Sequence, residues 1–95
     1  MKRVYICSPY AGDEARNAAR ARELCRFAIK DGCAPYAPHL LYPRILDDRQ
    51  AGLVCGLAFL EVCDEIWVYA DKGISEGMRG EIDHAQHLEM PVVIL

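Results

Sequence analysis

A serine, two glycines and a glutamate lie close together near the end of the chain, in residues 74–82. The apolar run 65–69 precedes them, and the helical pattern 78–89 begins among them. In open α/β sheets ligands bind where strands end and helices begin, and a helix start offers free backbone N–H groups to an anion. The first candidates for chemistry are therefore Ser75, Gly77 and Glu81.

Two interpretations of Glu81 stay open at this stage. A carboxylate at the edge of a buried helix face can attack an electrophilic sugar carbon, as in retaining glycosyl transfer, and its charge stabilises the positive transition state. A glutamate early in a helix is also a common exposed residue, because the helix dipole favours negative charge there.

The loop after the first apolar run, residues 3–7, is the second candidate region. Ser8 and Gly12 would allow a ligand close to the backbone, and Tyr10 offers a hydroxyl and a ring. Ordinary turn formation explains the same residues equally well.

Asp47 and Asp48 lie in the most polar stretch of the chain, residues 44–50. They either cap the following helix, with Arg49 as an ion-pair partner, or recognise a base. The sequence does not decide between these roles.

No metal or cofactor site is expected. His84 and His87 lie three residues apart on the last predicted helix, but no third ligand has a suitable spacing. His39 is a lone histidine and is expected to be a hydrogen-bonded structural residue.

Composition restricts the classes of protein and partner. Ninety-five residues, 53% of them hydrophobic, predict one domain over 1–95 with a real core, and surplus apolar surface predicts a homo-oligomer. The net charge of −3 argues against a nucleic acid polymer or an anionic membrane as partner. Five cysteines without a Cys-x-x-Cys pair favour a reducing cytoplasm, and no apolar run reaches the ~20 residues that span a bilayer.

Apolar runs alternate with helical patterns along the whole chain. Strands are expected at 3–7, 33–39, 65–69 and 91–95, and helices at 14–31, 50–62 and 78–89. This alternation predicts an α/β protein with a four-stranded parallel sheet, in a three-layer flavodoxin-like fold of strand order 2-1-3-4. The prolines around the second strand place it at an edge.

Four segments together resemble the DUF4406 family of the nucleoside 2-deoxyribosyltransferase-like superfamily. These are VYICSPY at 4–10, APHLL at 37–41, CDEIWV at 63–68 and ISEGMRGEI at 74–82. The resemblance covers nearly the whole chain. It implies a flavodoxin-like fold and a small nucleoside or nucleotide ligand, with a site shared between subunits.

The resemblance also implies roles for individual residues. In characterised members a serine or aspartate is followed by glycine two residues later and by the nucleophilic glutamate six residues later, a spacing that Ser75, Gly77 and Glu81 match. Glu81 would then take up the deoxyribosyl group and Ser75 would contact sugar or phosphate. Other implied ligand contacts are Ser8, Tyr10 and Gly12, with Asp47 or Asp48 as the acid that recognises the base or assists proton transfer.

The family pattern has glycine two residues before the glutamate, where this chain has Arg79. The leading hypothesis is an N-glycosidic-bond enzyme, either a 2-deoxyribosyltransferase or a hydrolase. The alternatives are a nucleotide-binding or sensing module without turnover, and a protein whose apolar surface only builds an oligomer.

Overall fold

A four-stranded parallel sheet forms the centre of the molecule in the computed structural model, which describes all residues, 1–95. The strands are β1 (Lys2–Cys7), β2 (Cys33–Tyr36), β3 (Glu65–Val68) and β4 (Val92–Ile94). Their order is β2-β1-β3-β4, as expected, so β1 is central and β2 lies at an edge.

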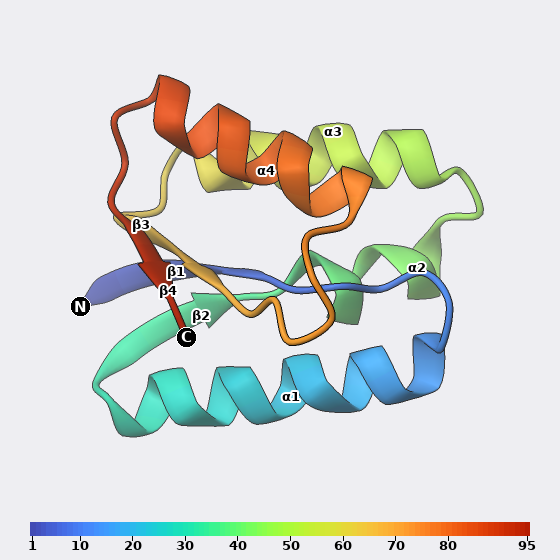
Figure 1. Cartoon of the computed structure of the whole chain (residues 1–95), viewed down its shortest axis with the longest axis horizontal. Coiled ribbons are helices and arrows are strands. Elements are labelled where there is room, and N and C mark those ends of the chain that lie inside the picture. Colours follow the sequence, from blue (N-terminus) through green and yellow to red (C-terminus); the bar gives the residue numbers. More distant parts are fainter.

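Helices cover both faces of this sheet. Helix α1 (Glu14–Lys30) lies on one face, and α3 (Arg49–Leu60) and α4 (Glu76–His87) lie side by side on the other (Figure 1). The predicted three-layer α/β fold is confirmed. None of the helices combines the length and apolar character needed to cross a membrane.

Strand β1 sends its side chains alternately into two separate cores, because successive residues of a strand face opposite sides of the sheet. Val4 and Ile6 pack with α1 residues such as Leu24. Tyr5 and Cys7 face the other way, toward α3 and α4. The residues of β1 that face α4 therefore include a hydroxyl and a thiol.

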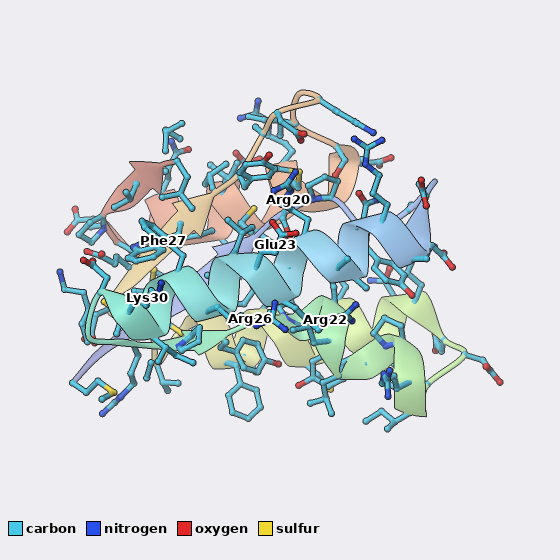
Figure 2. All side chains as sticks on the ribbon, turned by 90° about the horizontal axis from the view of Figure 1, so that it is seen from below. Arg20, Arg22, Glu23, Arg26, Phe27 and Lys30 are labelled. Atoms are coloured by element: carbon cyan, nitrogen blue, oxygen red, sulfur yellow. The ribbon has the colours of Figure 1, made fainter.

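The outer surface of α1 carries the charged residues Arg22, Arg26 and Lys30, all exposed (Figure 2), together with the exposed apolar side chains Phe27 and Ile29. Arg20 pairs with Glu23 at 2.8 Å, and Figure 2 shows both among the labelled side chains of this helix. The inner face is small and apolar, which lets the helix lie close to the sheet.

The segment after β2 differs from the expected extended strand and turn. The strand ends at Tyr36, and a 3₁₀ turn η1 (Pro38–Leu40) and a short helix α2 (Tyr42–Ile45) follow. Pro38 and Pro43 stand in the first turns of these two elements, where a missing backbone N–H costs nothing. Helix α1 begins at Glu14 as predicted, and the other ends of the three long helices differ from the predicted ones by one or two residues.

Caps explain where the three long helices begin. Asp13, Asp48 and Ser75 each accept a hydrogen bond from a backbone N–H of the first turn of α1, α3 and α4 respectively. The predicted cap of α3 is confirmed, and it is Asp48. Exposed apolar side chains on α3, Val54 and Phe59, agree with the expected self-association, which stays a prediction.

Two glycines let α3 approach its neighbours closely. A Cβ atom on Gly52 would lie 3.1 Å from the Cβ of Tyr42, and one on Gly56 would lie 3.0 Å from the Tyr5 hydroxyl. By contrast, Gly80 in α4 has nothing within 4 Å of the corresponding point. Only the α3 glycines are therefore required by packing.

Replacing Gly80 or Gly52 by alanine should separate the effect of packing on stability from the effect of helix propensity. Gly80→Ala is expected to raise the free energy of unfolding by about 0.5–1 kcal/mol, because alanine loses less chain entropy in a helix. Gly52→Ala is expected to lower it by about 1–3 kcal/mol through overpacking against Tyr42. Urea denaturation of the two variants measures both values, and a gain in both would show that the close approach is not a constraint.

Candidate functional site

The carboxyl group of Glu81 lies inside the protein, on the face of α4 that packs on the sheet. Glu81 is 3% exposed, and its neighbours on this face, Met78, Ile82 and Ala85, are also buried. Ser75 caps the helix by accepting from the N–H of Met78 at 3.3 Å. The cap at Ser75 therefore sets the start of α4 so that Glu81 faces the sheet. The interpretation of Glu81 as a solvent-exposed residue is wrong.

Two side chains of β1 hold the two carboxyl oxygens of Glu81. The Tyr5 hydroxyl donates to Oε2, and the Cys7 Sγ lies 3.5 Å from Oε1. Both donors project from the same face of the strand because they are two residues apart. Gly56 of α3 leaves the space in which the Tyr5 hydroxyl sits.

No cation accompanies this buried acid. None of the lysine, arginine or histidine side chains makes an ion pair with Glu81. Burial raises the pKa of Glu81 from 4.5 to about 7, and the hydrogen bonds from Tyr5 and Cys7 oppose part of that rise. The carboxyl group is thus available both as acid and as carboxylate near neutral pH.

Burial and the neighbouring carboxylate also act on the two donors. They raise the pKa of the Tyr5 hydroxyl and of the Cys7 thiol well above their usual ranges. Both groups therefore keep their protons at neutral pH and act as donors toward Glu81.

The loop after β1 is held by contacts of its own. His39 Nε2 lies 2.7 Å from the Ser8 carbonyl oxygen, and Asn17 donates to the Tyr10 carbonyl at 2.9 Å. Burial lowers the pKa of His39, so the neutral ring donates its Nε2 proton to this carbonyl. The expectation of a hydrogen-bonded structural histidine is confirmed.

Neither Tyr10 nor Ser8 forms a hydrogen bond with Glu81. The Tyr10 ring stacks on the His39 ring with centroids 5.1 Å apart. Ser8 is 1% exposed, and its hydroxyl is the one buried side-chain oxygen without a hydrogen-bond partner. Tyr5, rather than Tyr10, is the tyrosine that donates a hydrogen bond to the Glu81 carboxyl group.

A groove of about 350 Å³ opens between the β1–α1 loop and the start of α4. Its walls are formed by Pro9, Ala11, Gly12, Asp13, Asn17, Lys72, Gly73, Ile74 and Ser75. Two predicted ligand contacts, Gly12 and Ser75, thus face the same space, and Gly77 is exposed in the next turn. Glu81 does not line the groove, but it follows Ser75 by six residues, roughly 9 Å along the helix axis.

The paired aspartates lie at the start of α3. The carboxylate of Asp48 accepts from the N–H groups of Gln50 at 2.9 Å and Ala51 at 3.3 Å. Arg49 pairs with Glu14 of α1 at 3.5 Å instead of with either aspartate. The capping role is confirmed for Asp48, while base recognition by Asp47 or Asp48 stays a prediction.

Arg79 stands where the resemblance to DUF4406 implies a glycine, and it makes no ion pair with Glu81. Its side chain is 57% exposed and lies 3.9 Å from Asp83, one turn further along α4. This departure from the family pattern therefore changes the solvent side of α4 and not the surroundings of Glu81.

The histidine pair of α4 forms no metal site. His84 lies 2.9 Å from Glu61, and His87 is exposed. Across the chain, no group of three or more histidine, cysteine, aspartate or glutamate side chains is arranged to hold a metal ion.

Sequence reasoning missed Tyr5 and Cys7 because the first strand was treated as an apolar run. A signal was present: a tyrosine in the middle of a buried strand needs a hydrogen-bond partner for its hydroxyl. Strand alternation places residue 7 on the same face, so both point to whatever polar group the opposite helix offers.

Solved structures share this fold at low sequence identity. A 2-desoxiribosyltransferase from Leishmania mexicana superposes with a TM-score of 0.79 and 16% identity, covering 100% of this chain. A 2-deoxyribosyltransferase from Bacillus psychrosaccharolyticus gives 0.73 and 16%, covering 97% of this chain and 70% of that one. A CMP N-glycosidase from Clostridium botulinum gives 0.69 and 15%, covering 98% and 70%.

The present chain spans 64% of the length of the Leishmania protein. These likenesses show that the fold is nucleoside 2-deoxyribosyltransferase-like. No curated protein matches the sequence. Residues 2–95 match the family model described as Domain of unknown function (DUF7768), which corrects the resemblance to DUF4406.

The buried acid should make the stability of the fold depend on pH. Because the folded pKa of about 7 lies above the ordinary glutamate pKa of 4.5, the contribution of Glu81 to stability is fully present below pH 4.5 and is lost as pH rises through 7. Relative to Glu81→Gln, the wild type is expected to lose about 2–3 kcal/mol of unfolding free energy between pH 5 and pH 8.

Chemical denaturation of both proteins at the two pH values measures this difference. The lowered pKa of His39 makes stability change with pH in the opposite direction to Glu81. Because His39 is present in both proteins, its contribution cancels in the difference. Glu76→Gln, which removes an exposed carboxylate from the same helix, serves as the matched control. An equal difference between wild type and Glu81→Gln at both pH values would contradict the buried, cation-free site.

Proposed function

The chain belongs to the DUF7768 family, and we propose that it cleaves or transfers the N-glycosidic bond of a nucleoside or nucleotide, with Glu81 as the nucleophile. The observation that carries the proposal is the inward-facing Glu81 carboxyl group, bonded to Tyr5 without a nearby cation. The fold adds support, since the similar structures include two 2-deoxyribosyltransferases and a CMP N-glycosidase.

The chemistry follows from a carboxylate that is fixed by hydrogen bonds and has no cation to neutralise its charge. One oxygen of Glu81 attacks C1′ of the sugar, the C1′–N bond breaks, and the electron pair leaves with the base. The base takes a proton from Asp48. The glycosyl ester on Glu81 is then opened by water in a hydrolase or by a ring nitrogen of a second base in a transferase, and the proton lost by this attacking group returns to Asp48. Tyr5, which keeps its proton, fixes the direction in which the carboxylate faces.

Other residues take supporting roles in this proposal. The groove would hold the substrate, with the start of α4 and Lys72 favouring an anionic group such as a phosphate. The unpartnered Ser8 hydroxyl gives a buried polar atom next to the wall of the groove. The proposed substrate contacts are Ser8, Gly12, Asp47, Ser75 and Gly77, and the proposed groups that assist catalysis are Tyr10 and Asp48.

A nucleotide-binding or sensing role without turnover is the second candidate. It is favoured by one observation, namely that Glu81 is 3% exposed and does not line the groove. A ligand could bind between Gly12 and Ser75 without reaching the carboxyl group. Both roles predict nucleotide binding, but only the enzymatic role predicts a product.

Base release distinguishes these candidates. The wild-type protein is expected to release free base from at least one member of a panel of nucleosides and nucleoside monophosphates, and Glu81→Ala is expected to lower the rate by on the order of 10³-fold or more. Because the nucleophile must be ionised, the rate should rise with pH through about 7. Chromatographic quantification of free base gives the measurement.

Calorimetric titration with the same panel complements this assay. Tight binding without product after long incubation would replace the enzymatic proposal by the binding role. Equal release by the wild type and Glu81→Ala would remove Glu81 from the mechanism.

Tyr5→Phe should lower the rate of base release by roughly 10- to 100-fold, since one buried hydrogen bond to a charged group is lost. Its optimum should also move to higher pH, because the hydroxyl favours ionised Glu81. Tyr36→Phe is the matched control: it removes a hydroxyl that bonds Tyr42 at 2.7 Å and not Glu81. The same loss in both variants would point to general damage to the fold.

A further inference from the structure

Cys7 has no role in the proposed mechanism and none in the sequence analysis. It ends β1, is 0% exposed, and faces α4 together with Tyr5. Its Sγ lies 3.5 Å from Glu81 Oε1 and 3.9 Å from the carbonyl oxygen of Met78, one turn earlier in α4. A cysteine that only filled the core would have no polar atom of a carboxyl group beside its sulfur.

The thiol has one proton and two acceptors to choose from. When Glu81 is ionised, its oxygen is the stronger acceptor and attracts the S–H group. When Glu81 is protonated, the Met78 carbonyl is the competing acceptor within reach. The thiol can therefore follow the charge of Glu81 by a small rotation about one side-chain bond, while Tyr5 holds the other oxygen.

We propose that Cys7 is a positioning residue whose thiol holds the Oε1 oxygen of Glu81 when that carboxyl group is ionised. Its catalytic consequence rests on the proposed function, but the hydrogen bond itself does not. Because S–H is a weak donor, it supports the carboxylate without matching the strength of a hydroxyl. The oxygen it holds thus keeps more of its electron density than the oxygen held by Tyr5.

Two substitutions should move the titration of Glu81 in opposite directions. Cys7→Ala removes the donor and is expected to raise the midpoint by roughly 0.5–1 pH unit, whereas Cys7→Ser supplies a stronger donor and is expected to lower it by a similar amount. The measurement is the carboxyl ¹³C signal of Glu81 in protein labelled at glutamate, followed by NMR against pH. The signal is assigned by its disappearance in Glu81→Gln.

Cys33 provides a matched control. It is also buried in the sheet, but it packs in the core on the α1 side and has no contact with Glu81. Cys33→Ala and Cys33→Ser should leave the Glu81 midpoint where it is. Midpoints that stay unchanged in both Cys7 variants, or that move in the same direction, would overturn the proposal.

Base release separates this inference from the proposed function. If the protein turns over substrate, the pH profile of the rate should shift in each Cys7 variant by the same amount and in the same direction as the NMR midpoint. Opposite NMR shifts without any base release would sustain the role of Cys7 and reject the enzymatic function. Base release with unshifted NMR midpoints would sustain the enzymatic function and reject the role of Cys7. Should Cys7→Ser fail to fold, the upward shift expected for Cys7→Ala still decides the matter.

Discussion

A carboxyl group buried without a cation is the constraint around which this small domain is arranged. Hydrogen bonds from Tyr5 and Cys7 satisfy the oxygens of Glu81, but neutral donors recover only part of the free energy lost when a charge leaves water. The result is an acid with a pKa of about 7. Such a group holds a proton or a charge with nearly equal ease at neutral pH, which suits both nucleophilic attack and proton exchange.

The parallel sheet supplies the donors in the required places. β1 is central, so its residues are covered on both faces, and strand alternation places residues 5 and 7 opposite α4. The Ser75 cap fixes the start of α4 and thereby the direction of Glu81. A shift of one residue in β1 would exchange Tyr5 and Cys7 for the apolar side chains of the other core. Gly56 then completes the arrangement, because a larger residue would press on the Tyr5 hydroxyl.

The positions of the strands and of the long helices could be predicted because they depend on local signals, and the sheet order follows from the flavodoxin-like arrangement of such a chain. Apolar runs alternate with helical patterns, and aspartate, as at position 48, is a preferred helix-capping residue. The segment after β2 was less predictable, since Pro38 and Pro43 fit a turn as well as a helix start. The partners of Glu81 depend on which strand face lies across from α4, and the stacking of Tyr10 on His39 depends on the fold of two loops. Neither contact leaves a periodic trace in the sequence.

The free energy that it costs to bury the acid favours the enzymatic role over the binding role. A module that only binds nucleotides in the groove would gain nothing from Glu81, which does not line it, and a glutamine there could keep a hydrogen bond to Tyr5 without the desolvated charge. Proteins retain such locally unfavourable groups chiefly where function needs them. Because Glu81 is only 3% exposed, a substrate that reacted with it would have to displace part of its cover first.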